Sequence, residues 1–338
     1  MDRRGGAIST RIVNRVLAAL AIAGLMIAGA PIVAQPSRPD LGALKALFRR
    51  PDRIPHPVDA PLTPERIALG RTLFFDPRLS STGVASCASC HDPRRAFTDG
   101  GGRGVTGRST KNAAPMLWNL AWARALFWDG RAPTLEAQLR GPIESPDELG
   151  TSLQDIARRL NADTALRTSF ARAFPEKTEI DSALVVAALA AFERSLVSPP
   201  TRFDQWIAGD SVALTRAEID GFTLFTGKAG CSVCHGGWRF TDDKRHDIGR
   251  PITTEREDRN PAVKTPTLRE LTWTAPYMHD GSLPTLESVV DHYADRIIDR
   301  ATLAPELRRR QPLSQTERSA LVTFLMSLSG ASPPPLPD

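Results

Sequence analysis

The feature that most constrains this chain is the placement of its cysteines, because all four fall in two copies of one short motif. The motif is Cys-x-x-Cys-His, and its two copies supply Cys87, Cys90 and His91, and Cys231, Cys234 and His235. Two thiols at this spacing can form thioethers with the two vinyl groups of one porphyrin, and the adjoining histidine can then bind the iron. The motif therefore predicts two covalently attached c-type haems.

Two other arrangements of the same residues stay open. The cysteines could form two disulfides, or they could bind one zinc ion as four thiolates. Disulfides would leave the histidine after each motif unexplained, and a four-thiolate zinc site would not need those histidines. The sequence therefore favours haem.

Residues 1–34 have the pattern of a secretory signal peptide. A basic segment ends at Arg15, an apolar run covers residues 16–30, and Ala34 offers a small residue for cleavage before Gln35. The alternative is an uncleaved anchor, but the run is short for the roughly 20 residues that span a bilayer. We expect cleavage, no stable membrane span afterwards, and a periplasmic protein, because c-type haem is attached outside the cytoplasm.

The positive charge of the chain does not indicate a nucleic-acid partner. The formal net charge is +5, and the predicted signal peptide accounts for +3 of it. The carboxylates of two haems would make the mature protein slightly negative. We therefore expect no binding to nucleic acid.

An internal repeat surrounds the two haem motifs. The segment from Gly70 to Phe74 precedes the first motif, and a similar segment from Gly221 to Phe225 precedes the second. Each segment follows a helix-start signal, Thr63-Pro64 in the first case and the Thr215/Glu218 capping box in the second. A Gly-x-x-Leu-Phe helix ahead of the haem motif is typical of cytochrome c, so the repeat predicts two cytochrome c-like domains.

The rest of the chain predicts an all-α fold with long loops rich in glycine and proline. Residues 35–61 form a proline-rich lead, and helices are expected over 153–160, 182–197 and 314–328. Pro199-Pro200 breaks the pattern, which places the domain boundary there. We expect a first domain at residues 35–200 with the catalytic haem and a second at 201–338 with the electron-transfer haem.

The sixth position on each iron decides what the haem does. An electron carrier fills this position with a strong ligand, whereas a catalyst leaves it open for substrate. No histidine lies between the two motifs, and Met116, the one methionine there, has the spacing of a packing residue. The first haem is therefore expected to have an open face, which argues against a plain di-haem electron carrier.

At this point the chain resembles the bacterial di-haem cytochrome c peroxidase and MauG family. The segment that carries the resemblance is FWDGRAPTLEAQLRGPIESPDE at residues 127–148. In that family it supplies a tryptophan between the haems, followed by a glutamine and a glutamate on the open side of the first haem. The matching residues are Trp128, Gln138 and Glu148, with Pro142 shaping the pocket.

The resemblance gives these residues distinct roles. Cleaving a peroxide O–O bond needs a group that takes a proton from the inner oxygen and returns it to the outer one, which a carboxylate such as Glu148 can do. Trp128 would relay electrons between the haems, and Gln138 would donate a hydrogen bond in the pocket. Without the resemblance, Glu148 would be read as a surface acid and Trp128 as a core aromatic.

The ligand of the second iron opposite His235 has four candidates. They are Met278, His279, His292 and Tyr293. On a helix that starts after Thr285, Tyr293 shares the apolar face begun by Leu286, whereas His292 is turned about 100° away. The family ligand lies seventeen residues after the proline of a Pro-Tyr-x-His motif, which here gives Tyr293. Ordinary peroxidases have methionine at that position and the MauG branch has tyrosine, so the chain resembles the MauG branch.

A phenolate ligand stabilises oxidised iron. We therefore expect a second haem that is easily oxidised, and an enzyme that needs no reductive activation. The resemblance also implies a calcium ion between the haems, bound by Asn112, Thr274 and Pro276, with water completing the oxygen ligands. His246 and Arg269 are expected to hydrogen-bond haem propionates or the backbone.

The favoured function is reduction of hydrogen peroxide at the first haem, with electrons from a small cytochrome c or cupredoxin. The alternative is a MauG-like oxidase that modifies a protein or a small molecule. MauG has a tryptophan two residues before its second haem motif, used to draw electrons from a docked protein, and this chain has Ala229 there. This difference argues against maturation of methylamine dehydrogenase. A homodimer, common in the family, is also expected.

Overall fold

The computed structural model describes residues 41–101, 112–253, 259–334 and 336, so the predicted signal peptide lies outside the described residues. Both haem motifs lie in one compact unit of the chain, Gly42–Asp338. Helices dominate the described residues, as the sequence predicted. None of the described helices is long and apolar enough to cross a membrane.

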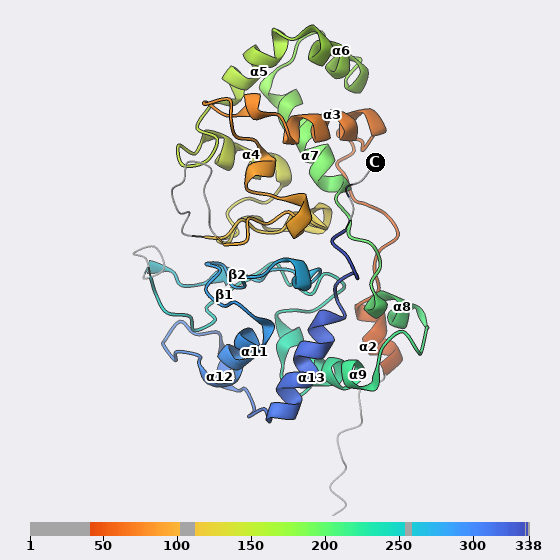
Figure 1. The fold of residues 1–338 in the computed structure, drawn as a ribbon, viewed down its shortest axis with the longest axis vertical. Helices are drawn as coiled ribbons and strands as arrows, with labels where there is room; N and C mark the ends of the chain where they lie inside the picture. Colours follow the sequence, from red (N-terminus) through yellow and green to blue (C-terminus); the bar gives the residue numbers. More distant parts are fainter. Residues whose placement is uncertain (1–40, 102–111, 254–258, 335, 337–338) are drawn as a thin grey trace, which may run out of the picture. The chain divides into compact units, whose positions relative to one another are not determined.

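One hydrophobic core is built from helices that follow the first Gly-x-x-Leu-Phe segment. Helix α7 is its centre, and α3, α4 and α5 all pack against it (Figure 1). The helices of this core are α3 (Pro64–Phe74), α4 (Leu135–Glu144), α5 (Leu153–Asn161), α6 (Thr164–Ala173) and α7 (Ser182–Ser195). The first haem motif begins in the short 3-10 turn η2 (Cys87–Ser89), and Cys87 packs against this core.

A second core lies around α13, against which α9 and α11 pack (Figure 1). Its helices are α8 (Arg202–Ala208), α9 (Arg216–Thr226), α11 (Leu286–Asp295) and α13 (Gln315–Met326). The short helix α12 (Pro305–Arg308) has no buried residue. The second motif begins in the 3-10 turn η5 (Cys231–Val233), and Cys231 packs against this core. The only two strands among the described residues, β1 (Arg245–His246) and β2 (Val263–Lys264), form a short antiparallel pair.

The internal repeat appears as two helix crossings that each depend on a glycine. A Cβ atom on Gly70 of α3 would lie 1.9 Å from the carbonyl oxygen of Ala188 in α7. A Cβ atom on Gly221 of α9 would lie 2.1 Å from the carbonyl oxygen of Ala320 in α13. No side chain fits at either crossing, so both helix pairs approach through the same glycine contact.

The predicted helix starts are confirmed. The side chain of Thr63 accepts the backbone N–H of Arg66 at the start of α3, and Thr215 and Glu218 form the capping box of α9. Ser314 caps α13, and Thr285 caps α11. These caps are local signals, since a side-chain oxygen needs to reach only an N–H two or three residues away.

The described structure also corrects the reading of the N-terminal lead. The segment expected as a proline-rich lead contains helix α2 (Leu41–Leu47), and Phe48 at its end packs in the second core rather than the first. Its ring lies 5.3 Å from that of Phe222 and 5.0 Å from that of Phe240. The domain division at residue 200 stays a prediction.

Candidate haem sites and the segment between them

The first Cys-x-x-Cys-His segment orients its histidine through backbone bonds. The N–H of His91 donates to the carbonyl of Cys87 at 3.0 Å, which closes the turn. Its Nδ1 lies 2.9 Å from the carbonyl oxygen of Phe97. Because a carbonyl only accepts, Nδ1 carries the proton and the lone pair of Nε2 is left for a metal. Burial lowers the pKa of His91, which keeps the ring neutral as a ligand must be.

The second segment repeats this geometry. The N–H of His235 donates to the carbonyl of Cys231 at 2.9 Å, and its Nδ1 lies 2.8 Å from the carbonyl oxygen of Phe240. Burial lowers the pKa of His235 to about 4. Burial also raises the pKa of the Cys87 and Cys231 thiols to about 12. Each site thus presents one neutral histidine beside two partly buried thiols, which is the set of groups that a covalently attached c-type haem needs.

Several buried polar atoms near these segments fit a haem. Among the described residues, Trp118 Nε1, Trp273 Nε1 and Arg250 Nε are buried donors with no hydrogen-bond partner. The Trp118 ring packs edge-on against Phe97, 5.3 Å between centroids, beside the His91 loop. A buried donor without an acceptor is costly, and the carboxylates of a haem are acceptors. The Trp118 donor beside the His91 loop therefore fits a haem at the first motif, and the two oriented histidines suit an iron at both motifs.

Trp128 is held by groups from distant parts of the chain. Its indole Nε1 donates to the carbonyl of Ala113 at 2.8 Å, and its own carbonyl accepts the N–H of Lys264 in β2 at 2.7 Å. The ring of His279 packs edge-on against it, 6.3 Å between centroids. His279 also accepts the N–H of Ala113 through its carbonyl at 2.9 Å. Trp128 therefore lies where residues 112–128 meet the segments that follow the second motif.

Gln138 and Glu148 are placed by α4 and the turn after it. Helix α4 starts at the cap residue Thr134 and contains Pro142, which has no N–H to donate to the carbonyl of Gln138 one turn earlier. The chain then folds back, because Leu149 N–H donates to the carbonyl of Pro142 at 3.0 Å. Both Gln138 and Glu148 are partly buried.

Electrostatic interactions link the Glu148 carboxyl to the first haem motif. Burial raises the pKa of the Glu148 carboxyl, Arg131 opposes this shift and Asp147 adds to it. Glu148 in turn contributes to the raised pKa of the Cys87 thiol, after burial, Glu193 and Cys90. The carboxyl therefore lies within electrostatic reach of the thiol that would anchor the first haem.

Tyr293 on α11 lies near the second haem motif. Burial raises the pKa of its phenol, the Cys231 and Cys234 thiols raise it further, and Arg250 lowers it. His292 points elsewhere: it is buried, and its Nε2 lies 2.9 Å from the carbonyl oxygen of Ile248. This hydrogen bond occupies the nitrogen that His292 would need as an iron ligand.

The three residues expected to bind calcium lie in neighbouring segments. Asn112 directly precedes Ala113, which is bonded to His279, and Pro276 follows Thr274 in the chain segment that leads to His279. Among the described residues, the one cluster of histidine, cysteine and acidic side chains that could hold a metal is Cys234, Asp242 and His246. That cluster is part of the second haem site, where His246 Nε2 and Asp242 Oδ2 are 2.8 Å apart. Calcium binding stays a prediction.

The structure adds residues that the sequence reasoning did not select. Lys264 is partly buried beside Trp128, and burial lowers its pKa to about 8. Glu193 is a buried acid in α7, and burial raises its pKa to about 8. The signal for Glu193 was present, since it is the one acidic residue within the apolar run of α7.

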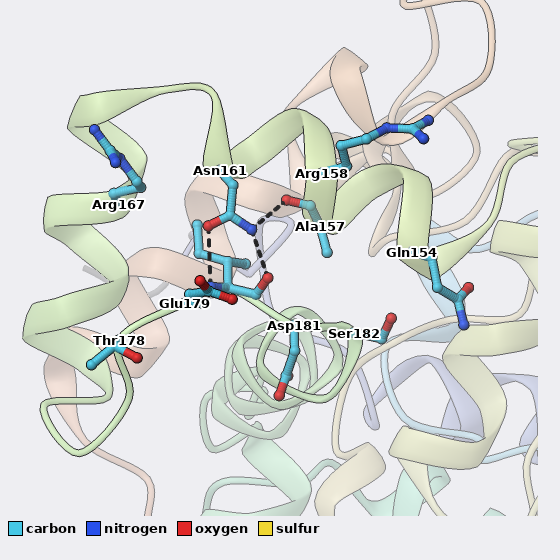
Figure 2. A pocket seen from close by; sticks show the side chains of 10 residues that line it. Gln154, Ala157, Arg158, Asn161, Arg167, Thr178, Glu179, Asp181 and Ser182 are labelled. Carbon is cyan, nitrogen blue, oxygen red and sulfur yellow. Dashed lines mark hydrogen bonds between the residues drawn. The ribbon is translucent and has the colours of Figure 1, made fainter.

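An open pocket of about 720 Å³ lies away from all the predicted site residues. It is lined by α5, α6 and the start of α7 (Figure 2). Asn161 bridges its wall by donating to the carbonyl oxygens of Ala157 and Ile180 and accepting the N–H of Ile180. No cysteine or histidine lines it, so it is not a haem site.

Comparisons with known proteins agree with this geometry. A family model described as di-haem cytochrome c peroxidase matches residues 64–212. The chain is 46% identical to methylamine utilization protein MauG of Methylorubrum extorquens over 315 residues, which cover 88% of each protein. It is 35% identical to cytochrome c551 peroxidase of Nitrosomonas europaea, with 82% of this chain and 84% of that protein covered. The crystal structure of a MauG-like protein associated with microbial copper homeostasis matches with a TM-score of 0.73 at 34% identity, covering 83% of this chain and 95% of that one.

Proposed function

Because the chain belongs to the di-haem cytochrome c peroxidase and MauG family, we propose that it reduces hydrogen peroxide in the periplasm with electrons from a small redox protein. It is an oxidoreductase of that type, and the family implies two covalently bound c-type haems. Cys87, Cys90 and His91 would hold the first haem. The second haem would be held by Cys231, Cys234, His235 and Tyr293.

The observation that carries this proposal is the position of Glu148. Its carboxyl is partly buried, acts electrostatically on the Cys87 thiol and has a raised pKa. A simple electron carrier does not need a carboxyl of this kind beside its haem. A peroxidase does, because a carboxyl beside the iron can accept a proton from one peroxide oxygen and return it to the other.

When bound, the first haem supplies the iron at which the peroxide O–O bond is broken. In our proposal Glu148 takes the proton from the inner peroxide oxygen on one carboxylate oxygen and returns it to the outer oxygen, which leaves as water. Gln138, on the helix before it, orients the peroxide by hydrogen bonding. Pro142 would shape the turn between the two residues, because its ring removes an N–H from the last turn of α4.

Trp128 would carry electrons between the two sites. Its indole N–H and its backbone carbonyl are both bonded, to Ala113 and Lys264 respectively, so the ring cannot turn away from its position. A side chain fixed from both sides keeps the path length constant, which is what a relay requires. Tyr293 would stabilise the oxidised second haem through its phenolate.

The test is steady-state peroxide turnover by the haem-loaded protein with reduced cytochromes c and cupredoxins as donors. We expect Glu148→Gln to retain both haems and to lower the rate of peroxide reaction by about 10²-fold or more. Glu144→Gln is the matched control, because Glu144 is an exposed acid one turn earlier that bonds only to Arg140. Peroxide kinetics that are equal in the two variants would remove Glu148 from the proton-transfer role.

The second candidate is a MauG-like oxidase that modifies a protein or a small molecule. It is favoured by the 46% identity to MauG and by Tyr293 at the ligand position. Ala229 replaces the tryptophan expected for long-range oxidation of a docked protein. The same assay separates the two candidates: a peroxidase turns over small redox donors, whereas an oxidase consumes peroxide only when its substrate is present.

Four further parts of the proposal concern the whole protein. We propose export to the periplasm through the signal peptide at residues 1–34, and two cytochrome c-like domains divided near residue 200. We also propose a calcium ion held by Asn112, Thr274 and Pro276, and a homodimer. Support for calcium comes from the backbone bond between Ala113 and His279, which brings the segment of Asn112 to that of Pro276.

A further inference from the structure

Helix α7 contains a buried carboxyl that the mechanism above does not use. Glu193 is only 4% exposed, and its Oε2 has no hydrogen-bond partner among the described residues. It follows Phe192, which is fully buried in the first core. An ionised carboxylate is costly in such surroundings unless it is paired. Burial accordingly raises the pKa of Glu193 to about 8, Arg194 opposes the shift and Glu136 adds to it.

Glu193 lies on α7 between Phe192 and Leu196, which belong to the core against which Cys87 of the first haem motif packs. After burial, Glu193 is the largest contributor to the raised pKa of the Cys87 thiol, ahead of Cys90 and Glu148. Leu196, one turn later, accepts the N–H of Asn119 through its carbonyl at 2.7 Å, so the end of α7 is bonded to the residue after Trp118. Glu193 and Trp118 thus each carry a buried polar atom without a partner in the same core.

The internal repeat shows that this acid is not needed for packing. The crossing at Gly70 aligns α7 with α13, so that Phe192 corresponds to Phe324. Glu193 then corresponds to Leu325, which is buried at 7% exposure in the second core. The same helix crossing is therefore complete with leucine at this position. The chain places an acid only at the site where peroxide would react.

Among the described residues, Glu193 has no ion-pair partner. Arg194 is bound to Glu136 at 2.6 Å instead. The 3-10 turn at Leu120–Trp122, which also packs on α7, carries no charge. The other charged residues on the helices packed against α7 do not contribute to the pKa shift of Glu193; they are Glu65, Arg66 and Arg71 on α3, Arg140 and Glu144 on α4, and Asp155, Arg158 and Arg159 on α5.

We propose that Glu193 is a proton-holding group coupled to the first haem: it takes up a proton from solvent when that haem gains an electron. The inference rests on the proposed function. Reduction of one hydrogen peroxide to two waters consumes two electrons from the donor protein and two protons from solvent. Glu148 only moves a proton that the peroxide already carries. Glu193 would deliver one of the two additional protons to an oxygen that leaves as water, and its carboxylate would then be reprotonated from solvent.

The proposal predicts a link between pH and the redox potential of the first haem. An added electron makes the haem more negative, which raises the pKa of a carboxyl beside it. Glu193 therefore has a lower pKa in the oxidised protein than in the reduced protein. In the pH range between these two values, the redox potential of the first haem must fall as pH rises. Glutamine has nearly the same shape but cannot titrate. In Glu193→Gln the slope is lost, and its potential meets that of the wild type at acidic pH and exceeds it at alkaline pH.

The experiment is a redox titration of the haem-loaded protein at a series of pH values, with infrared difference spectra of the oxidised and reduced forms. In the wild type we expect the sloping potential and a band from a protonated carboxylic acid that changes with redox state. Both should be lost in Glu193→Gln and retained in Glu144→Gln. If Glu193→Gln does not fold, Glu193→Leu, which copies Leu325, serves in its place. A slope and a band unchanged in these variants would overturn the proposal.

The two proposals fail in distinguishable ways. If the wild type shows no peroxide turnover but Glu193→Gln still loses the slope, the peroxidase function is wrong and the redox-coupled proton remains. A second outcome is normal peroxide turnover with a pH-dependent potential that is lost in Glu148→Gln but kept in Glu193→Gln. In that case Glu148 binds the redox-coupled proton and Glu193 has no such role.

Discussion

Replacing Asp204 by alanine should strongly destabilise the second core, because among the described residues Asp204 is the one carboxylate bonded to the completely buried Arg269. Its two carboxylate oxygens accept from Nη1 and Nη2 of Arg269 at 2.7 and 2.8 Å, and Arg269 is 0% exposed. Asp204 Oδ2 also accepts the N–H of Thr201 at 2.8 Å in the capping box of α8. The Nε–H of Arg269 donates to the carbonyl of Trp238 at 2.8 Å, three residues after His235, the proposed iron ligand.

The expected cost follows from these contacts. Removing one partner of a buried ion pair costs about 3–5 kcal/mol, because the other charge is left uncompensated. Loss of a helix cap costs about 1 kcal/mol more. The sum is about 4–6 kcal/mol, against a total stability of about 5–15 kcal/mol for a typical domain. The second core should therefore be close to unfolding at room temperature.

The assay is guanidinium denaturation of the haem-loaded protein, followed by circular dichroism. Asp204→Ala should shift the midpoint of the second core sharply downward. The double variant Asp204→Leu/Arg269→Met removes both charges and should be more stable than Asp204→Ala, since apolar replacements of a buried pair are often tolerated. A destabilisation below about 1 kcal/mol, typical of an exposed ion pair, or a double variant no better than the single one, would refute the reasoning.

The same pair predicts the response to acid. Burial alone would raise the pKa of Asp204, but the charge and hydrogen bonds of Arg269, with help from Thr201 and Arg50, outweigh burial and lower it. The stabilisation is then fully present above the unfolded value of about 3.9 and is lost only as pH falls through the lower folded value. The wild type should thus keep its second core at a lower pH than Asp204→Ala.

Three further outcomes are expected. Mass spectrometry of the mature protein should show two covalent haems and no free thiol, and one haem or a titratable thiol would contradict the assignment of all four cysteines. Tyr293→Met should markedly raise the potential of the second haem in redox titrations, because a thioether replaces a phenolate, whereas Met278→Leu should not; the reverse result would make Met278 the ligand. Gly70→Val should cost at least about 1–3 kcal/mol in denaturation experiments, since its Cβ would overlap the carbonyl of Ala188, whereas the exposed Thr72→Ala should be neutral.

Much of the helical framework could be predicted because its signals are local. Thr63, Thr215 and Ser314 each cap a helix within three residues of themselves, so their neighbours in sequence suffice to identify them. Helix α2 was missed because the prolines around it dominate the composition of that segment. Its role depends on Phe48 meeting a core formed by residues more than 150 positions later, which no local pattern reports.

In the candidate site too, local features could be predicted from the sequence and long-range contacts could not. The two haem motifs at Cys87 and Cys231 can be recognised from the sequence alone, because the porphyrin fixes the spacing of their cysteines. Arg269 was expected to bond to a propionate or the backbone, and the backbone bond to Trp238 is present. Its pairing with Asp204, 65 residues away, depends on how α8 packs and could not be read from the sequence. Glu193 was visible as an acid in an apolar run, but only the fold shows which motif it faces.

The position of Phe48 makes the two ends of the chain depend on each other. Its ring fills the second core from a segment that precedes the whole first core, and it touches the rings of Phe203, Phe222 and Phe240. A chain cut at Pro199-Pro200 would leave a void the size of a phenyl ring, which costs about 3–5 kcal/mol in a packed core. The residues after Pro200 therefore cannot be transferred to another protein as an independently folding domain. Any such transfer must also include α2 and Phe48, which precede the first core in the sequence.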